Sequence, residues 1–218
     1  EDVVVIDTET TGFSFNHDEL IQIAAARMVH GEIVGWYVTF VNPGKLIPEE
    51  VAHLTNISDE DVANAPDPNT AVAGLVEFVG SSDVVAHNAN FDRTFCTKYP
   101  TGEVLKQNCW IDSLDLAKIA LPRLTSHRLL DLVRAFGGPD STHRADDDVA
   151  ATCLVYRVLL AAVDTMPAPL LQHIADMCDS DTWNTERVFK CLAAMKESEG
   201  PYSLRASRKA AVAQASAP

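Results

Sequence analysis

The segment VVVIDTETTG, residues 3–12, runs from four aliphatic residues straight into two carboxylates. An unbroken apolar run of this kind is typical of a strand that is buried on both faces. We predict a strand over residues 2–7, which places Asp7 at its end and Glu9 two residues further on. If the strand continues, the two side chains point to the same side and repel each other unless a cation lies between them. Such oxygen ligands suit Mg²⁺ or Mn²⁺, whereas a plain solvent-exposed strand end is the alternative.

The rest of the chain alternates strand-like and helix-like segments. Residues 20–41 hold two β-like runs joined at His30-Gly31-Glu32, which predicts an antiparallel hairpin. Short strands are expected at 83–87 and within 109–113. Apolar residues recur at helical spacing in 70–80, 91–99, 114–121, 126–138 and 143–164. We therefore predict an α/β fold, with a mixed, mostly five-stranded sheet flanked by helices.

The C-terminal part of the chain differs in pattern from the rest. Residues 168–197 predict two amphipathic helices, whereas the segment from Gly200 has three basic residues, no acids and little to bury. We expect one domain over 1–165, a helical extension over 166–198 and a flexible tail or linker over 199–218. The extension is either a docking surface or a simple addition that packs on the core.

Composition sets limits on the function. The net charge of −14 argues against nucleic acid as a partner, unless several acids hold divalent ions and reverse the local sign. Five cysteines without a Cys-x-x-Cys pair argue against a disulfide framework or a thiolate zinc site. No apolar run approaches the length of a membrane span and no signal pattern is present. We expect a cytoplasmic protein with no membrane partner.

A second acidic site lies in AHNANFD, residues 86–92. Asn90 is expected to cap a helix whose first turn holds Asp92. An acid in the first turn is also what the helix dipole favours, so a purely structural Asp92 is an equal alternative.

A third acidic site lies in HRADDD, residues 143–148. Asp147 and Asp148 stand at the N-terminal edge of the apolar stripe of a long helix, so either can point inward. Asp146 lies further round the helix and is expected in solvent. His143 precedes the helix beside these acids, which makes it a candidate general base.

The three sites in this order form a specific combination. A DxE at a strand end, an Asp in HNANFD and a His-x-x-x-x-Asp near a helix start (His143 to Asp148), in this order, resemble the motifs of the DEDDh family of 3'-5' exonucleases over residues 2–164. The sequence is most similar to the proofreading ε-subunit type of bacterial DNA polymerase III. It is also similar to the exonuclease domains of bacterial DinG-like helicase proteins, and residues 40–66 match the connecting region of both.

The resemblance implies a ribonuclease H-like fold and a role for each motif residue. Two divalent cations, Mg²⁺ or Mn²⁺, would be held by Asp7, Glu9, Asp92 and Asp148, with His143 as general base; the His-to-Asp spacing selects Asp148 over its neighbours. Six residues would contact the terminal nucleotide: Thr10, Thr11, Gly12, Phe13, Asn88 and Phe91. Phe13 or Phe15 could stack on a base, although core packing is the alternative for all three phenylalanines and is preferred for Phe91. Local basic groups would then draw the substrate: Arg93, Arg128 and Arg144.

The resemblance implies digestion of DNA 3' ends, single-stranded by expectation, in a bacterial cytoplasm, together with a polymerase or helicase partner or fused domain. Two other readings stay open. An exoribonuclease of the same superfamily would carry the same motifs, because the contact that separates RNA from DNA is made to the 2'-OH. A non-catalytic module that keeps the fold and binds a polymerase, a helicase or a nucleic-acid end is the other, and the presence of all five motif residues argues against it.

Overall fold

The structure, a computed structural model, describes residues 2–138, 144–177 and 183–199. The contacts within it divide the chain into two compact units, Glu1–Ala161 and Ala162–Pro218. His143 and residues 200–218 of the tail expected over 199–218 lie outside the described residues, so the predictions made for them stay predictions.

The first unit is built on a mixed five-stranded sheet in the order β3-β2-β1-β4-β5. Strand β1 pairs antiparallel with β2 and parallel with β4, and β5 continues the parallel side. The strands are β1 (Asp2–Thr10), β2 (Leu20–Val29), β3 (Glu32–Phe40), β4 (Asp83–Ala86) and β5 (Trp110–Asp112). The predicted fold class is confirmed.

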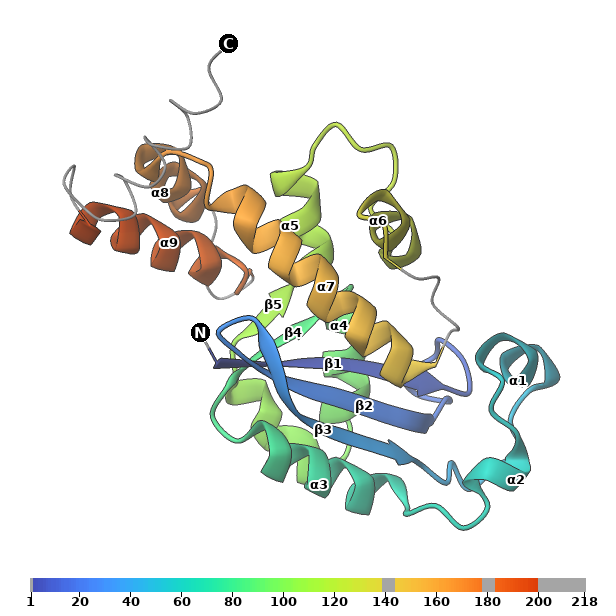
Figure 1. Ribbon diagram of the computed structural model, residues 1–218. Coiled ribbons are helices and arrows are strands. Elements are labelled where there is room, and N and C mark those ends of the chain that lie inside the picture. Colours follow the sequence, from blue (N-terminus) through green and yellow to red (C-terminus); the bar gives the residue numbers. More distant parts are fainter. Residues whose placement is uncertain (1, 139–143, 178–182, 200–218) are drawn as a thin grey trace. The chain divides into compact units, whose positions relative to one another are not determined.

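Helices flank this sheet (Figure 1). Helix α3 packs against a core to which β1 and β2 contribute, and α7 crosses the other face in the view of Figure 1. The helices of the first unit are α1 (Glu49–Thr55), α2 (Asp59–Val62), α3 (Pro68–Val79), α4 (Ala89–Thr97), α5 (Ser113–Ala120), α6 (Leu129–Ala135) and α7 (Ala145–Val163), with a 3-10 helix η1 (Pro100–Gln107) that the sequence did not predict.

Strand β1 is longer than predicted. The ladder with β2 continues to the pair Thr10–Leu20, with a register shift after Glu9. Asp7 and Glu9 therefore lie inside the strand and not at its tip. Val4 and Ile6 belong to the core shared with α3, so the alternation of a strand sends Asp7 and Glu9 toward the α7 side. The ladder, which the sequence of β1 alone cannot reveal, fixes both carboxylates on one face.

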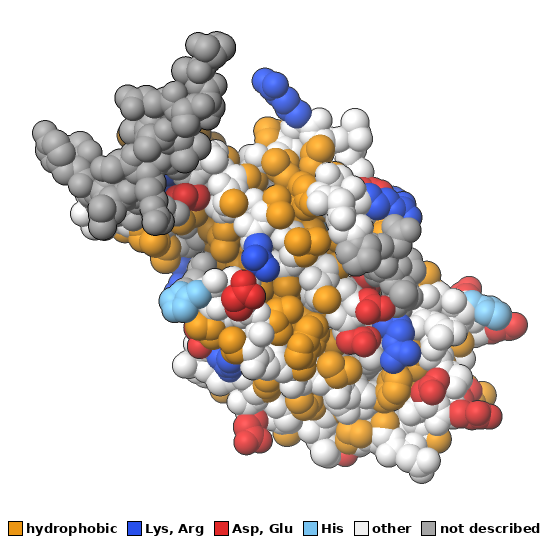
Figure 2. Space-filling view, in the orientation of Figure 1, with side chains coloured by type: hydrophobic (Ala, Val, Ile, Leu, Met, Phe, Trp, Pro, Cys, Tyr) orange, Lys and Arg blue, Asp and Glu red, His pale blue; other side chains and the backbone are white. Residues whose placement is uncertain are grey.

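The β2–β3 connection is the predicted hairpin. His30 and Gly31 both have positive φ, 52° and 84°, as a two-residue turn of the mirror-image type requires. Beyond the turn, β3 is the edge strand, and four of its apolar side chains are exposed: Ile33, Val34, Trp36 and Val38. Figure 2 shows apolar surface of this kind between scattered charges.

The start of α4 differs from the prediction. The helix begins at Ala89, and the residue before it, Asn88, is left-handed with φ 71° and makes no side-chain capping bond. Asn90 is thus inside the helix, and its predicted role as the cap was wrong. The prediction assumed that a nearby Asn side chain would accept from the first N–H groups of the helix. The carboxylate of Asp112 accepts from the N–H groups of Asn88 and Ala89 instead.

The second unit holds a helix pair, α8 (Ala168–Asp176) and α9 (Glu186–Glu199). Leu171, Ala175 and Phe189 are buried, and Trp183 stacks on Phe189 with ring centroids 5.9 Å apart. Among the described residues, no single helix is long and apolar enough to span a membrane; one pair, α7 and α8, would pass only if joined across a bend of 115°.

Candidate metal centre and nucleic-acid site

Three carboxylates from distant parts of the sequence meet in the first unit. Asp7 and Glu9 come from β1, and Asp148 comes from the first turn of α7. One oxygen of each lies within 4.8 Å of the others. All three side chains are partly buried. The proximity that the motifs imply for these residues is present in the structure, and it is the spacing at which three acids can share a cation.

The fourth acid of the set approaches from α4. Asp92 is buried, with 3% of its surface exposed, and its Oδ1 accepts a hydrogen bond of 2.8 Å from the hydroxyl of Thr8. Thr8 lies between Asp7 and Glu9 but points to the opposite face of β1. The Asp92 carboxylate still acts on Asp7, whose pKa it raises. Thr8 was missed by the sequence reasoning, because a threonine in a strand carries no signal of its own.

These acids do not ionise easily as they stand. Burial, and then the charges of Asp148 and Asp92, raises the pKa of Glu9 to about 8. Burial raises the pKa of Asp92 to about 7, against the opposing effect of the Thr8 hydrogen bond. Burial and then the neighbouring Asp92, Asp148 and Glu9 raise the pKa of Asp7. A group of partly buried oxygen ligands that repel one another as anions suits a hard divalent cation, so the donor set fits the metal that the family implies.

The structure separates the three consecutive aspartates at the start of α7. Asp148 joins the cluster with Asp7 and Glu9. Asp147 is exposed. Asp146 keeps a side chain that is 40% exposed, in keeping with the expected contact with solvent, and its Oδ1 lies 3.5 Å from Nε of Arg144. An α-helix turns by about 100° per residue, which is why three neighbouring acids meet three different surroundings.

The loop from β1 to β2 carries the three residues expected beneath the nucleotide. The Thr10 hydroxyl donates to the carbonyl of Gly12 at 2.6 Å. The Thr11 hydroxyl donates to Asp18 and accepts from the Glu19 N–H. Asp18 also accepts from the Ser14 N–H and from Lys45, and a Cβ on Gly12 would lie 2.5 Å from one of its oxygens. The side chains of Thr10 and Thr11 therefore brace the loop from inside.

Aromatic rings line the outer side of the same loop. Phe13 is 83% exposed and Phe15 is 36% exposed. Both approach Phe91 of α4, with ring centroids 6.2 and 6.0 Å away, and Phe91 in turn packs on buried Phe95. Phe91 is partly buried against the core, in keeping with the packing role preferred for it. Phe13 presents a free ring face, which core packing does not explain.

The remaining predicted residues have mixed surroundings. Asn88 is exposed, and its left-handed backbone places it at the entrance to α4. Arg93 bonds weakly to the carbonyl of Lys106, Arg128 precedes α6, and Arg144 lies over the ring of Phe40. The general-base candidate His143 falls outside the described residues.

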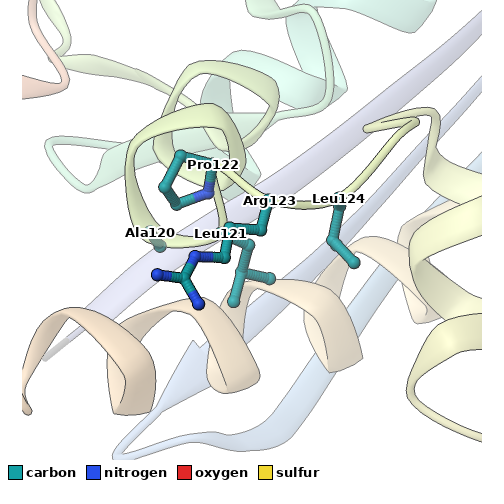
Figure 3. A pocket seen from close by; sticks show the side chains of 5 residues that line it. All are labelled: Ala120, Leu121, Pro122, Arg123 and Leu124. Carbon is teal, nitrogen blue, oxygen red and sulfur yellow. The ribbon is translucent and has the colours of Figure 1, made fainter.

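A pocket of about 360 Å³ lies away from these acids, where the chain leaves α5. Figure 3 shows its lining residues on this one segment: Ala120, Leu121, Pro122, Arg123 and Leu124. None of the carboxylates lines it. A mainly apolar pocket of this kind offers a divalent ion no ligand, so we assign the chemistry to the acid cluster and not to the pocket.

Comparison with known proteins agrees with this picture. A DNA polymerase III of PolC type from Clostridium perfringens is 38% identical over 160 residues, which cover 72% of this chain and 11% of that protein. E. coli exonuclease I, solved with a dA16 oligonucleotide, aligns over 79% of this chain and 42% of its own with a TM-score of 0.63 and 22% identity. Exonuclease X, solved with 5' overhanging duplex DNA, aligns over 70% of this chain and 89% of its own with a TM-score of 0.55 and 24% identity.

The chain spans only a small part of the curated relatives that it matches, 11% in the first and 14% in a PolC-type polymerase of Oceanobacillus iheyensis. The likeness to DinG-like proteins stays a prediction. Residues 4–156, well over half of the chain, match the family RNase_T, which is described as Exonuclease. The chain therefore belongs to the RNase T exonuclease family, which confirms the 3'-5' exonuclease resemblance drawn from its motifs.

Proposed function

We propose that this chain removes nucleotides from the 3' ends of single-stranded DNA, with two divalent cations, Mg²⁺ or Mn²⁺, as cofactors. The observation that carries the proposal is the meeting of Asp7, Glu9 and Asp148, with ligand atoms within 4.8 Å of one another and Asp92 beside them. DNA is favoured over RNA because exonuclease I and exonuclease X were solved with DNA and the matching relatives are DNA polymerases.

Each acid has a task in this proposal. Asp7, Glu9, Asp92 and Asp148 hold the cations, and Asp7, which feels the charges of the other three, is the candidate to face both. When bound, two such ions neutralise the attacking and leaving oxygens of a phosphodiester, whose negative charge otherwise repels the nucleophile. Thr8 orients the carboxylate of Asp92 through its hydrogen bond.

The other residues position the substrate and move a proton. His143 accepts the proton of the attacking water, at a pH where the imidazole is neutral. Thr10 and Thr11 hold the loop in shape, so that the backbone around Gly12 stands under the terminal nucleotide. The exposed ring of Phe13 stacks on a base, with Phe15 beside it. Exposed Asn88 contacts the same nucleotide from the start of α4, and Phe91 supports both rings from behind.

The test is digestion of a labelled single strand with Mg²⁺ or Mn²⁺. A 5' label should give a ladder of shortened products, whereas a 3' label should appear at once as a mononucleotide. EDTA, or Asp7→Ala with Glu9→Ala, should abolish both patterns, and Glu77→Ala, an exposed acid on α3, should leave them unchanged. Digestion of an RNA strand of the same sequence, compared with the DNA strand, distinguishes an exoribonuclease from a DNA exonuclease.

Two results would overturn the proposal. One is the absence of digestion by the unsubstituted protein with either metal, which would favour the non-catalytic module. The other is undiminished digestion by the Asp7→Ala, Glu9→Ala protein, which would place the activity elsewhere. Faster digestion of the RNA strand would make RNA the preferred substrate and would leave the proposed metal-dependent hydrolysis unchanged.

A further inference from the structure

The turn that precedes α4 is held from a neighbouring strand. Asn88 adopts φ 71° and ψ 53°, a left-handed conformation that an Asn adopts occasionally, helped by a local hydrogen bond of its side chain. Its own side chain makes no capping bond to the helix. Something else must therefore stabilise the turn and satisfy the first N–H groups of α4.

Asp112, the last residue of β5, supplies these bonds. Its Oδ1 accepts from the N–H of Asn88 at 3.0 Å, and its Oδ2 accepts from the N–H of Ala89 at 3.1 Å. The same Oδ1 accepts from the N–H of Leu114 at 2.9 Å, which makes Asp112 the cap of its own helix, α5. Strands β4 and β5 are parallel neighbours with Ala86 opposite Asp112, so their carboxyl ends lie together (Figure 1). One carboxylate thus accepts from backbone N–H groups at the N-termini of two helices, α4 and α5.

Two bonds of His87, the residue before Asn88, hold the same turn from the other side: one reaches the start of α5 and the other the segment before α6. Nδ1 of His87 lies 2.9 Å from the hydroxyl of buried Ser113, and Nε2 lies 3.0 Å from the carbonyl of His127. A carbonyl only accepts, so Nε2 carries the proton and Nδ1 accepts from Ser113. Residues on both sides of Asn88 are therefore fixed to the start of α5, and the turn has little freedom to choose another conformation.

The consequence reaches the acid cluster through α4. Asp92 lies one turn into this helix, and its carboxylate meets the Thr8 hydroxyl at 2.8 Å. A shift of the first turn of α4 would move Asp92 relative to β1, where Asp7 and Glu9 are fixed by the sheet. Exposed Asn88 would move with it.

We propose that Asp112 is a positioning residue, which holds the left-handed turn at Asn88 and thereby sets Asp92 against Asp7 and Glu9. The inference rests on the proposed function, because the place of Asp92 matters only if it holds a cation. Asp112 itself touches neither substrate nor metal in this proposal and acts through the backbone of residues 88 and 89.

Mn²⁺ affinity measured by calorimetry without DNA is the first readout. Asp112→Ala should weaken Mn²⁺ binding about tenfold to a hundredfold, the usual effect of losing a group that orients a ligand. Asp112→Asn keeps an acceptor for Asn88 and Leu114 but turns an NH₂ group toward the Ala89 N–H, so its loss should be smaller. Amide exchange at Asn88 and Ala89 should quicken in both variants. In digestion assays the loss should fall mainly on kcat and less on KM.

The matched control is Asp67→Ala. Asp67 caps α3 in the same way, by accepting from the N–H groups of Asn69 and Thr70, but α3 carries none of the predicted ligands. Its removal should lower stability and leave Mn²⁺ affinity unchanged. If Asp112→Ala behaved like Asp67→Ala, with the unsubstituted protein binding Mn²⁺ normally, Asp112 would be a helix cap and this inference alone would fail.

The Asn88→Gly substitution tests the turn itself. Glycine adopts positive φ without the Cβ penalty, so Asp112→Ala should weaken Mn²⁺ binding less in an Asn88→Gly protein than in the parent. Equal losses in the two backgrounds would contradict a role in holding the left-handed residue. An unsubstituted protein that bound no Mn²⁺ and digested no strand would overturn the proposed function, and this inference with it.

Discussion

The carboxyls on β1 give the metal-free protein an unusual dependence on pH. Glu9 has a pKa of about 8 in the folded state against 4.5 for a free side chain, so between these values the folded chain binds more protons than the unfolded one. The free energy of unfolding therefore falls as pH rises through this window. From pH 6.5 to 8.5 we expect a loss of about 2 kcal/mol in EDTA, measured by urea unfolding.

Two controls isolate this effect. Burial lowers the pKa of His87 to about 4, against 6.5 for a free side chain, so near pH 6.5 only the unfolded chain binds a proton there. This adds a small rise in stability with pH, less than about 0.5 kcal/mol, which is opposite in sign to the effect of Glu9. Glu9→Gln should reduce the loss, and the part that remains belongs to Asp7 and Asp92, whose pKa values are also raised. A saturating divalent ion should remove the loss by taking the place of the protons. A metal-free protein that gained stability with rising pH would show that these carboxyls do not titrate as the structure implies.

Phe13 offers a second test at the scale of one side chain. Its ring is 83% exposed, so Phe13→Ala should change the free energy of unfolding by less than about 0.5 kcal/mol. If the ring stacks on a base, KM for a single strand should rise about fivefold or more, since such stacking contributes about 1–3 kcal/mol per base. Val104→Ala, at another exposed apolar residue, is the control. An unchanged KM would assign the substrate contact to other residues.

At the scale of elements, the loop between β1 and β2 acts as one braced unit. A methyl group on Gly12 would lie 2.5 Å from Oδ2 of Asp18, and Asp18 cannot yield without losing bonds to Thr11, Ser14 and Lys45. Gly12→Ala should therefore destabilise the protein by about 1–3 kcal/mol and weaken strand binding. Gly35→Ala on β3 meets only an ordinary contact at 3.8 Å and should do neither. Differential scanning calorimetry measures the change in stability, and a titration with a single strand measures the change in binding.

The strands and most helices could be predicted because their patterns are local. The run of three valines and one isoleucine in β1, the His30-Gly31 turn and the apolar stripe of α7 each show their conformation within a few residues. The end of β1 could not be predicted in this way, since the ladder with β2 extends it. The start of α4 was misplaced for a similar reason, because its cap comes from Asp112, 24 residues away from Asn88.

The residues of the site likewise fall into those that a local motif predicts and those that only the fold reveals. Asp7, Glu9, Asp92 and Asp148 could be named because their acids stand in motifs, and the structure brings Asp7, Glu9 and Asp148 within reach of one cation. The residues that hold these acids in place carry no such motif. Thr8 acts through one hydrogen bond to Asp92, and Asp112 through bonds to the start of α4, between segments that only the fold brings together. Asp18 accepts several bonds that brace the β1–β2 loop, and no motif marks it either.

At the scale of the whole molecule, charge sets how long the chain can stay on its substrate. The net charge of −14 opposes a polyanion. Within the described part of the chain, we expect the acid site with its bound cations, and local basic groups such as Arg93, to counter this repulsion. The relatives carry the matching segment within a much longer polymerase, of which this chain spans 11–14%. In such a longer protein, other domains can bind the strand and keep its 3' end at a high effective concentration near the exonuclease site.

We therefore expect this chain alone to release the strand after one or a few cleavages. Digestion of a labelled oligonucleotide should be followed with a large excess of unlabelled trap, so that each product reports a single encounter. We expect few nucleotides to be removed per encounter, and more when the salt concentration is lowered. Salt screens the few cationic contacts that bind the strand, so lower salt should slow its dissociation. Long runs in the presence of the trap would contradict the expectation, and would require a cationic path along the first unit that its composition does not suggest. Fusion of a strand-binding domain to the C-terminus should then lengthen the runs without changing the rate of a single cleavage, because it alters dissociation and leaves the acids of β1, α4 and α7 untouched.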